Sequence, residues 1–198
     1  MITRQRAFLG KAVAFALVLP FATAILTGEL RYRGSQVSDK KTGLTLLPVK
    51  IMDAVAVSST TYHYFVVLPA GEWRFESSKD SPLSGSDGKF EVTLMATDAP
   101  ASPAKSLEGL LAKLQAESGL EIREPQVLEE RGHQILRYQA RPAGVKSLDG
   151  WQWNYWTIAV DEGYGIVLHL STMDQTLGTG GEEQRLRTLL TSLRADFK

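Results

Sequence analysis

Cysteine is absent from this 198-residue chain, and so is an excess of charge of either sign. Without Cys the protein has no disulfide, thiolate metal site, cysteine nucleophile or lipid-modified cysteine. Lys and Arg number 22, Asp and Glu also number 22, and the formal net charge is zero. Because nucleic-acid binders usually carry a basic excess, we expect no nucleic-acid partner.

Composition and length predict one folded domain with a short extra segment. Hydrophobic residues make up 43% of the chain and charged residues 22%, which suffices for a core and argues against disorder. A chain of this length has no room for two ordinary domains.

The N-terminus carries the pattern of an export signal. The basic residues Arg4, Arg6 and Lys11 precede an uncharged run from Ala12 to Gly28. Two outcomes stay open. A signal peptide of residues 1–24 would be cleaved after Ala24, where the sequence offers the small-x-small pattern. Alternatively, residues 12–28 would be retained as an anchor in the inner membrane, since their length is at the short end for a membrane span. Either way, we expect the remainder to be periplasmic or otherwise extracytoplasmic.

The pattern after the N-terminal segment divides the chain at residue 60. Residues 29–60 are expected to form a tether and an irregular segment, because 29–42 are polar. The apolar but irregular run 43–57, which contains Pro48, is left open as a strand or a loop. Residues 61–198 are expected to form the domain. Its first strand is predicted to begin at Thr61, with bulky side chains on both faces.

Alternating and helical periodicities predict the elements of this domain. Hairpins are expected about Arg131-Gly132 and about Asp161-Glu162-Gly163, and a turn at Asp87-Gly88. A first helix is expected from an N-cap at Ser106, since the leucines that follow have helical spacing, at Leu107, Leu110, Leu111 and Leu114. A second helix is expected at the end of the chain, because the sequence there has a single apolar stripe. The stripe of this last helix consists of Leu186, Leu189, Leu190, Leu193 and Phe197.

Strands, a helix, two hairpins and a final helix predict an α+β fold with a mainly antiparallel sheet. Because several strands are bulky on both faces, helices are expected on both faces of the sheet, as a three-layer α/β/α sandwich. A dimer could cover the second face instead.

The run Tyr64-Phe65-Val66-Val67-Leu68-Pro69-Ala70-Gly71-Glu72-Trp73 resembles the opening of DcrB-like and PsbP-like domains. The helix at Ser106-Leu107-Glu108, the hairpins at Gly132-His133 and Gly163-Tyr164-Gly165, and the helix from Glu182 to Asp196 follow in the same order. The resemblance spans about residues 61–197 and implies the PsbP-like sandwich. It also implies a non-enzymatic role, and it supplies no catalytic residue.

Few residues support catalysis or metal binding. His63, His133 and His169 each stand alone, with no second His at ligand spacing, so no metal site is expected. His63 and His169 could still meet across the sheet. The Gly178-Thr179-Gly180-Gly181 loop precedes a helix as phosphate-binding loops do, but Glu182 and Glu183 would repel an anion. We expect no cofactor and no enzyme.

The richest aromatic segment is Trp151-Gln152-Trp153-Asn154-Tyr155-Trp156, with three of the four Trp residues of the chain. On a strand, Trp151, Trp153 and Tyr155 share one face, while Trp156 lies on the other. If their face is open, these three residues form an aromatic ladder that binds a ligand or partner. If a helix covers it, they belong to the core.

These observations favour a non-enzymatic envelope protein that binds another protein or stabilises an envelope complex, with Trp151, Trp153 and Tyr155 as candidate binding residues. The alternative is a carrier of a small or apolar ligand, held between sheet and helix by Trp153, Tyr155 and Trp73. A hydrolase-like enzyme is the third hypothesis, and it requires a His close to a carboxylate.

Overall fold

A computed structural model describes most of the chain after residue 28. The described residues are 29–40, 43–49, 53–76, 82–98, 100, 102–116, 119–145, 150–174, 177 and 181–195. The expected signal peptide or anchor therefore lies outside the described residues, as do Phe197 and Gly178 to Gly180. Within the described ranges, no helix is long and apolar enough to cross a membrane.

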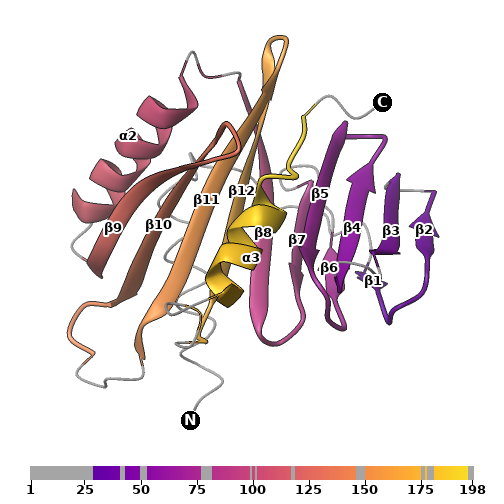
Figure 1. Cartoon of the computed structure of the whole chain (residues 1–198), viewed down its shortest axis with the longest axis horizontal. Coiled ribbons are helices and arrows are strands. Elements are labelled where there is room, and N and C mark those ends of the chain that lie inside the picture. The colour runs from indigo at the N-terminus through magenta and orange to yellow at the C-terminus, as the bar shows by residue number, and fades with distance from the viewer. Residues whose placement is uncertain are drawn as a thin grey trace.

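The larger of two sheets has eight strands, and every neighbouring pair is antiparallel. Its order is β1-β6-β7-β8-β12-β11-β10-β9 (Figure 1). The strands are β1 Glu29–Arg31, β6 Arg74–Glu76, β7 Leu83–Ser86, β8 Phe90–Asp98, β9 Leu120–Glu130, β10 His133–Pro142, β11 Gln152–Asp161 and β12 Tyr164–Thr172.

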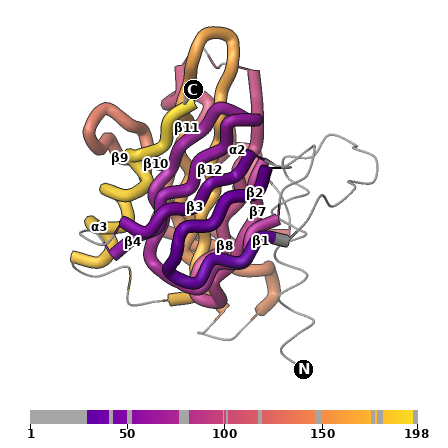
Figure 2. The backbone as a smooth tube through the Cα atoms, turned by 90° about the vertical axis from the view of Figure 1, so that its right-hand side faces the viewer, coloured from indigo at the N-terminus to yellow at the C-terminus, as the bar shows by residue number. Residues whose placement is uncertain are grey.

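The smaller sheet has the order β2-β3-β4-β5 and is also antiparallel. Its strands are β2 Val37–Asp39, β3 Leu44–Val49, β4 Ala54–Ser59 and β5 Tyr64–Pro69. The chain after the last helix closes the outer edge of β5, because the Phe65 and Arg194 backbones exchange two hydrogen bonds. Figure 2, viewed from the side of the molecule where β2 lies, shows β2, β3 and β4 nearest the viewer.

Two described helices accompany the sheets. In α2, Pro103–Ala116, Pro103 occupies the first turn, where its missing N–H costs nothing. The N-cap is Ser102, whose hydroxyl accepts the Lys105 N–H, and not the expected Ser106, which lies inside the helix. The second helix, α3, spans Gly181–Leu190, and Leu193 continues its apolar stripe in the following turn.

The molecule has three layers: α2, the large sheet, and a layer that holds both α3 and the small sheet (Figure 1). Leu107, Leu110 and Leu114 of α2 pack against one face of β10 and β11. Leu186, Leu190 and the inward side chains of both sheets form the main core on the other face. The predicted α+β class is confirmed, and helices do cover both faces, although the small sheet shares one face with α3.

The structure differs from the expected tether and irregular segment at residues 29–60. β1 pairs with β6, and β2 to β4 form one sheet with β5. Leu44, Leu46, Val55 and Val57 are buried in the main core. The fold therefore continues across the expected domain boundary at residue 61.

The predicted turns are confirmed where the backbone needs positive φ. Arg131 and Gly132 have φ of 52° and 79° between β9 and β10, and Gly163 has φ of 72° between β11 and β12. At the third turn, Asp87 Oδ1 accepts the N–H groups of Lys89 and Phe90, beside Gly88 with φ of 88°. These residues fix the register of the hairpins that carry the candidate site.

Candidate functional site

The aromatic segment lies at the start of β11, and its side chains separate as predicted. Trp153 and Tyr155 belong to the main core beneath α3, whereas Trp156 and Ile158 belong to the cluster beneath α2. The alternation places two aromatic sets of the same strand in two different environments.

Trp151, Trp153 and Tyr155 could be either an exposed ladder or buried, and in the structure they are buried. Their exposed fractions are 7%, 2% and 0%, so they form no exposed ladder. The reason is the third layer, because α3 and the small sheet pack over the main core that contains Trp153 and Tyr155. Trp151, outside the apolar core clusters, is covered in part by arginine side chains.

Arginines stack on this aromatic segment, side by side across the sheet. The Arg123 guanidinium carbon lies 4.0 Å from the Trp151 ring centroid and that of Arg141 lies 4.5 Å from it. Arg137 lies 3.9 Å from the Trp153 ring centroid. Each stack adds cation–π attraction to the packing of the indole. We call Arg123, Gln139, Arg141 and Trp151 the arginine–tryptophan layer.

Strand register explains how this layer is built. Arg141 pairs with Glu121, and Gln139 pairs both with Arg123 on β9 and with Trp153 on β11. Arg141 Nη2 lies 2.6 Å from Glu121 Oε2, and Arg123 Nε donates to Gln139 Oε1. The hydrogen bond from Arg141 and another from the Gly144 backbone N–H lower the pKa of Glu121. The guanidinium groups are therefore fixed by neighbours on the same face.

A buried ion pair joins this face to α3. Arg137 Nε lies 2.7 Å from Glu183 Oε1, and Arg137 Nη2 donates to Glu183 Oε2 over 3.3 Å. The side chains are 8% and 11% exposed, while Glu124, at 4.0 Å from Arg137, is 54% exposed. Glu183 lies in the first turn of α3, where the helix dipole favours a carboxylate.

Beside this pair, β11 carries three buried polar atoms that make no well-formed hydrogen bond among the described residues. They are Trp153 Nε1, the Tyr155 hydroxyl and Thr157 Oγ1. Burial raises the pKa of Tyr155 to about 12 and Glu183 adds to the rise, while the charge of Arg137 and a hydrogen-bonding contact with its side chain oppose it. The Tyr155 hydroxyl is therefore protonated at neutral pH. Native proteins pair nearly all such atoms, so three on one strand face indicate a specialised region.

On the opposite face of β11, by contrast, the buried polar side chains form hydrogen bonds with one another. Trp156 Nε1 donates to the Tyr138 hydroxyl over 3.0 Å. His169 Nε2 lies 2.9 Å from Asn154 Oδ1, and its ring stacks on Trp156 at 4.0 Å between centroids. Burial lowers the pKa of His169 to about 3, so this imidazole is neutral at physiological pH.

The three histidines lie apart, and none contacts a carboxylate. His63 lies in the turn before β5 with φ of 49°, not in the strand expected for it, while His169 lies on β12 of the other sheet. His133 contacts Arg194 Nη1 at 3.0 Å. The described residues contain no group of three side chains able to hold a metal ion.

The N-terminal end of α3 borders a cavity of about 180 Å³. Phe90, Leu177 and Leu189 contribute apolar lining. Its cationic residues are engaged, because Lys89 Nζ lies 2.9 Å from Asp174 Oδ2 and Arg185 donates to the Asp53 carbonyl over 2.7 Å. The cavity therefore offers no free charge to orient a ligand.

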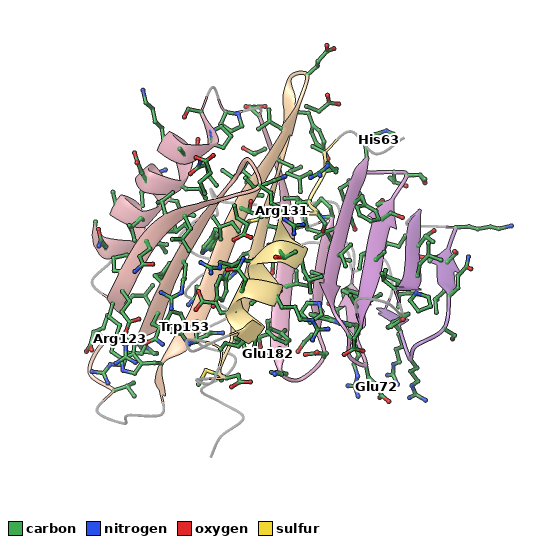
Figure 3. The ribbon with its side chains drawn as sticks, in the orientation of Figure 1. His63, Glu72, Arg123, Arg131, Trp153 and Glu182 are labelled. Atoms are coloured by element: carbon green, nitrogen blue, oxygen red, sulfur yellow. The ribbon has the colours of Figure 1, made fainter. Side chains whose placement is uncertain are left out.

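Sequence reasoning found the aromatic residues of the site but missed its charged ones. Arg137, Gln139 and Arg141 alternate with Leu136, Tyr138 and Ala140, and this alternation alone predicts a polar face on β10. Glu183 is far from Arg137 in the sequence, and only the fold joins them. Figure 3 shows Arg123 and Trp153 on the part of the sheet beside the end of α3 that carries Glu182.

No protein-family model and no curated protein matches the chain. Among solved structures, the chain is similar to the solution structure of cyanobacterial PsbP (CyanoP) from Synechocystis sp. PCC 6803. The TM-score is 0.43 and the sequence identity 15%, over 90% of this chain and 98% of that chain. The expected PsbP-like resemblance is confirmed as a distant likeness of fold, and nothing about partner or activity follows from it.

Proposed function

We propose that this protein is a non-enzymatic, exported protein of the cell envelope that binds another protein through the open side of the arginine–tryptophan layer. The observation that carries the proposal is the stacking of Arg123 and Arg141 on Trp151 at 4.0 and 4.5 Å. Trp and Arg are the side chains most enriched where protein interfaces bind tightly. Here they are already held in one geometry, which lowers the entropic cost of association.

The position of the layer supports a docking role. β9 is an edge strand of the large sheet, and α2 packs on the other face of β9 to β11. The consecutive residues Arg123, Glu124, Pro125 and Gln126 are all exposed. A bulge at Glu124, with φ of 52°, and Pro125 interrupt the edge, so a partner would bind this face through side chains rather than as an added strand.

A non-enzymatic role is supported by the separation of the three histidines from one another. The enzyme hypothesis needs a His within reach of a carboxylate, and each described His instead contacts a ring, an amide or a cation, or lies in an exposed turn.

Export is supported by the N-terminal pattern of the sequence, in which basic residues precede the uncharged run from Ala12 to Gly28. Fractionation of cells with N-terminal sequencing of the recovered protein tests this part. We expect the protein outside the cytoplasm, either beginning after Ala24 or retaining residues 12–28 in the inner membrane. Recovery of the uncleaved chain in the cytoplasm would contradict it.

Photo-crosslinking in intact cells tests the docking face. A photoreactive residue replaces Gln126, which is exposed beside Arg123 and pairs with Arg137 on β10. The matched control replaces Lys113, an exposed residue of α2 on the far side of the large sheet. We expect a discrete protein adduct from position 126 and none from position 113. Absence of an adduct at 126, or identical adducts from both positions, would overturn the proposal.

A second candidate, a carrier of a small ligand, is favoured by one observation. Trp153 Nε1, the Tyr155 hydroxyl and Thr157 Oγ1 are buried beneath α3, and none of them makes a well-formed hydrogen bond among the described residues. Trp73 does not join them, because its N–H donates to the Pro69 carbonyl and its ring stacks on Phe75. Native mass spectrometry of the purified protein tests this candidate, which predicts a co-purifying small molecule lost in Tyr155→Phe.

A further inference from the structure

Arg123 differs from the other arginines around the site in what its guanidinium contacts. Arg137 lies against Glu183, Arg141 against Glu121, and Arg187 lies 3.9 Å from Glu130. Arg123 is exposed, and its contacts among the described residues are the Trp151 ring and Gln139. It is therefore the cation of this face whose charge no described carboxylate offsets directly.

These two contacts hold the guanidinium group in place. The guanidinium carbon lies over the Trp151 ring at 4.0 Å from its centroid, and Nε donates to Gln139 Oε1, so the group is held from two directions. Trp151 is 7% exposed and Gln139 is 3% exposed, so both supports are themselves held by packing. The two Nη groups remain as a planar pair of donors, a geometry that matches the two oxygens of a carboxylate.

We propose that Arg123 is a preorganised binding residue for a single carboxylate, supplied by an acidic side chain of the protein partner. Trp151 and Gln139 act as positioning residues, since they orient the guanidinium without contacting the ligand. This inference rests on the proposed function and names the chemistry that the docking face recognises.

The surrounding charges favour one carboxylate over a dense polyanion. Glu121 and Glu124, 40% and 54% exposed, flank Arg123 along β9, and their contacts with Arg141 and Arg137 bring both to this face. A nucleic acid or an anionic membrane would place several phosphates near these carboxylates. The net charge of zero provides no wider attraction for such a surface. A lone carboxylate can approach the two Nη groups between the flanking glutamates.

A titration with two peptides that differ by one charge tests this inference on the full chain in a neutral detergent. The probes are Ac-Ala-Glu-Ala-NH2 and Ac-Ala-Gln-Ala-NH2, followed by NMR at the Arg123 Nε–H and the Trp151 indole N–H. We expect saturable shifts with the Glu peptide at both signals, with affinity up to about fivefold higher than for the Gln peptide. Arg123→Lys should remove this difference, because an ammonium keeps the charge and loses the planar pair of donors.

The matched control is Arg74→Lys, which changes an exposed arginine on β6 and should leave the preference intact. Equal affinities for the two peptides would overturn the inference, and so would an undiminished preference in Arg123→Lys. Tighter binding of inorganic phosphate, or of phosphatidylglycerol vesicles, at the same signals would overturn it in favour of a phosphate ligand.

Different results would contradict the proposed docking face and the proposed carboxylate site at Arg123. Crosslinks from position 126 that persist in Arg123→Lys, without a preference for the Glu peptide, would leave the docking face in place and refute the carboxylate. A preference for the Glu peptide without any crosslink would refute the protein partner and leave Arg123 as a carboxylate site.

Discussion

The two faces of β11 carry tryptophans three residues apart in contrasting environments. Trp156, beneath α2, donates its N–H to Tyr138 and stacks on His169. Trp153, beneath α3, has an N–H without a partner among the described residues and lies under the Arg137 guanidinium. Both rings are buried, at 1% and 2% exposed, so burial alone does not distinguish the faces.

The difference lies in how buried polar groups are satisfied. The α2 face pairs its Trp, Tyr, His and Asn side chains with one another. The α3 face holds a buried ion pair and, on β11, three buried atoms without a well-formed hydrogen bond among the described residues. Buried groups left unpaired cost stability, and proteins that tolerate them commonly do so at functional positions. This difference is what we expect if the α2 face serves folding and the margin of the α3 face serves the proposed binding.

Truncating either tryptophan should produce the largest effect. We expect Trp153→Ala and Trp156→Ala each to reduce the free energy of unfolding by about 3–5 kcal/mol, since each leaves a large cavity in a packed layer. Chemical denaturation measures both, with Val160→Ala, at 43% exposed, as the control of small effect. A small loss for Trp153→Ala alone would mean that this ring lies at a surface and would break the comparison.

The second-largest loss of stability is expected from breaking the buried ion pair. Glu183→Gln keeps the shape of the side chain but leaves the Arg137 cation poorly compensated, and we expect a loss of about 3 kcal/mol. The double variant Arg137→Met/Glu183→Leu removes both charges and should recover most of that loss. If the double variant is no more stable than Glu183→Gln, charge compensation is not what the pair contributes to this face.

The elements that could be predicted from the sequence are those whose signal is local. The leucine spacing of α2 and the turn residues Arg131-Gly132 and Glu162-Gly163 sit in the segments that form those elements. β3 could not be told from a loop in the sequence, because Pro48 interrupts its pattern. The structure tolerates Pro48 because β2 pairs only with Leu44 to Leu46, so that β3 has a free edge where Pro48 lacks an N–H.

The charged part of the site could not be predicted, because its geometry depends on pairings between distant segments. Glu183 meets Arg137 only once α3 packs on β10 and β11. Arg123 reaches Trp151 only because the bulge at Glu124 shifts the register of β9 against β10. Local periodicity assigned the aromatic side chains to faces, but the layer that covers one of these faces lies elsewhere in the chain.

The α2 face should make stability depend on pH through His169. Its folded pKa, lowered to about 3, lies below the value of 6.5 in an unfolded chain, so the unfolded state binds the extra proton between these values. Stability is therefore complete above pH 6.5 and is lost as pH falls, by about 1.4 kcal/mol per unit below about pH 6.

Thermal unfolding between pH 7.5 and 5 measures this slope, and His169→Gln should flatten it. His133→Gln is the control, because burial and the Arg194 cation also lower the pKa of His133, but burial acts on it less strongly than on His169. A slope unchanged in His169→Gln would place the pH dependence outside the α2 face.

The smallest effects are expected from two substitutions that each remove one tyrosine hydroxyl. Tyr138→Phe removes the acceptor of the Trp156 N–H and leaves that donor buried and unpaired, so we expect a loss of about 1–2 kcal/mol. Tyr155→Phe removes a hydroxyl that contacts Arg137 but makes no well-formed hydrogen bond among the described residues, so the loss should be smaller than for Tyr138→Phe and close to zero. Denaturation at neutral pH measures the difference, because the Tyr155 pKa of about 12 keeps its hydroxyl protonated there. Equal losses would mean that the Tyr155 hydroxyl is bonded in solution. If the loss in Tyr155→Phe also disappears once co-purifying molecules are removed, the bonded group is a ligand, and the α3 face is a binding site beneath the helix rather than beside it.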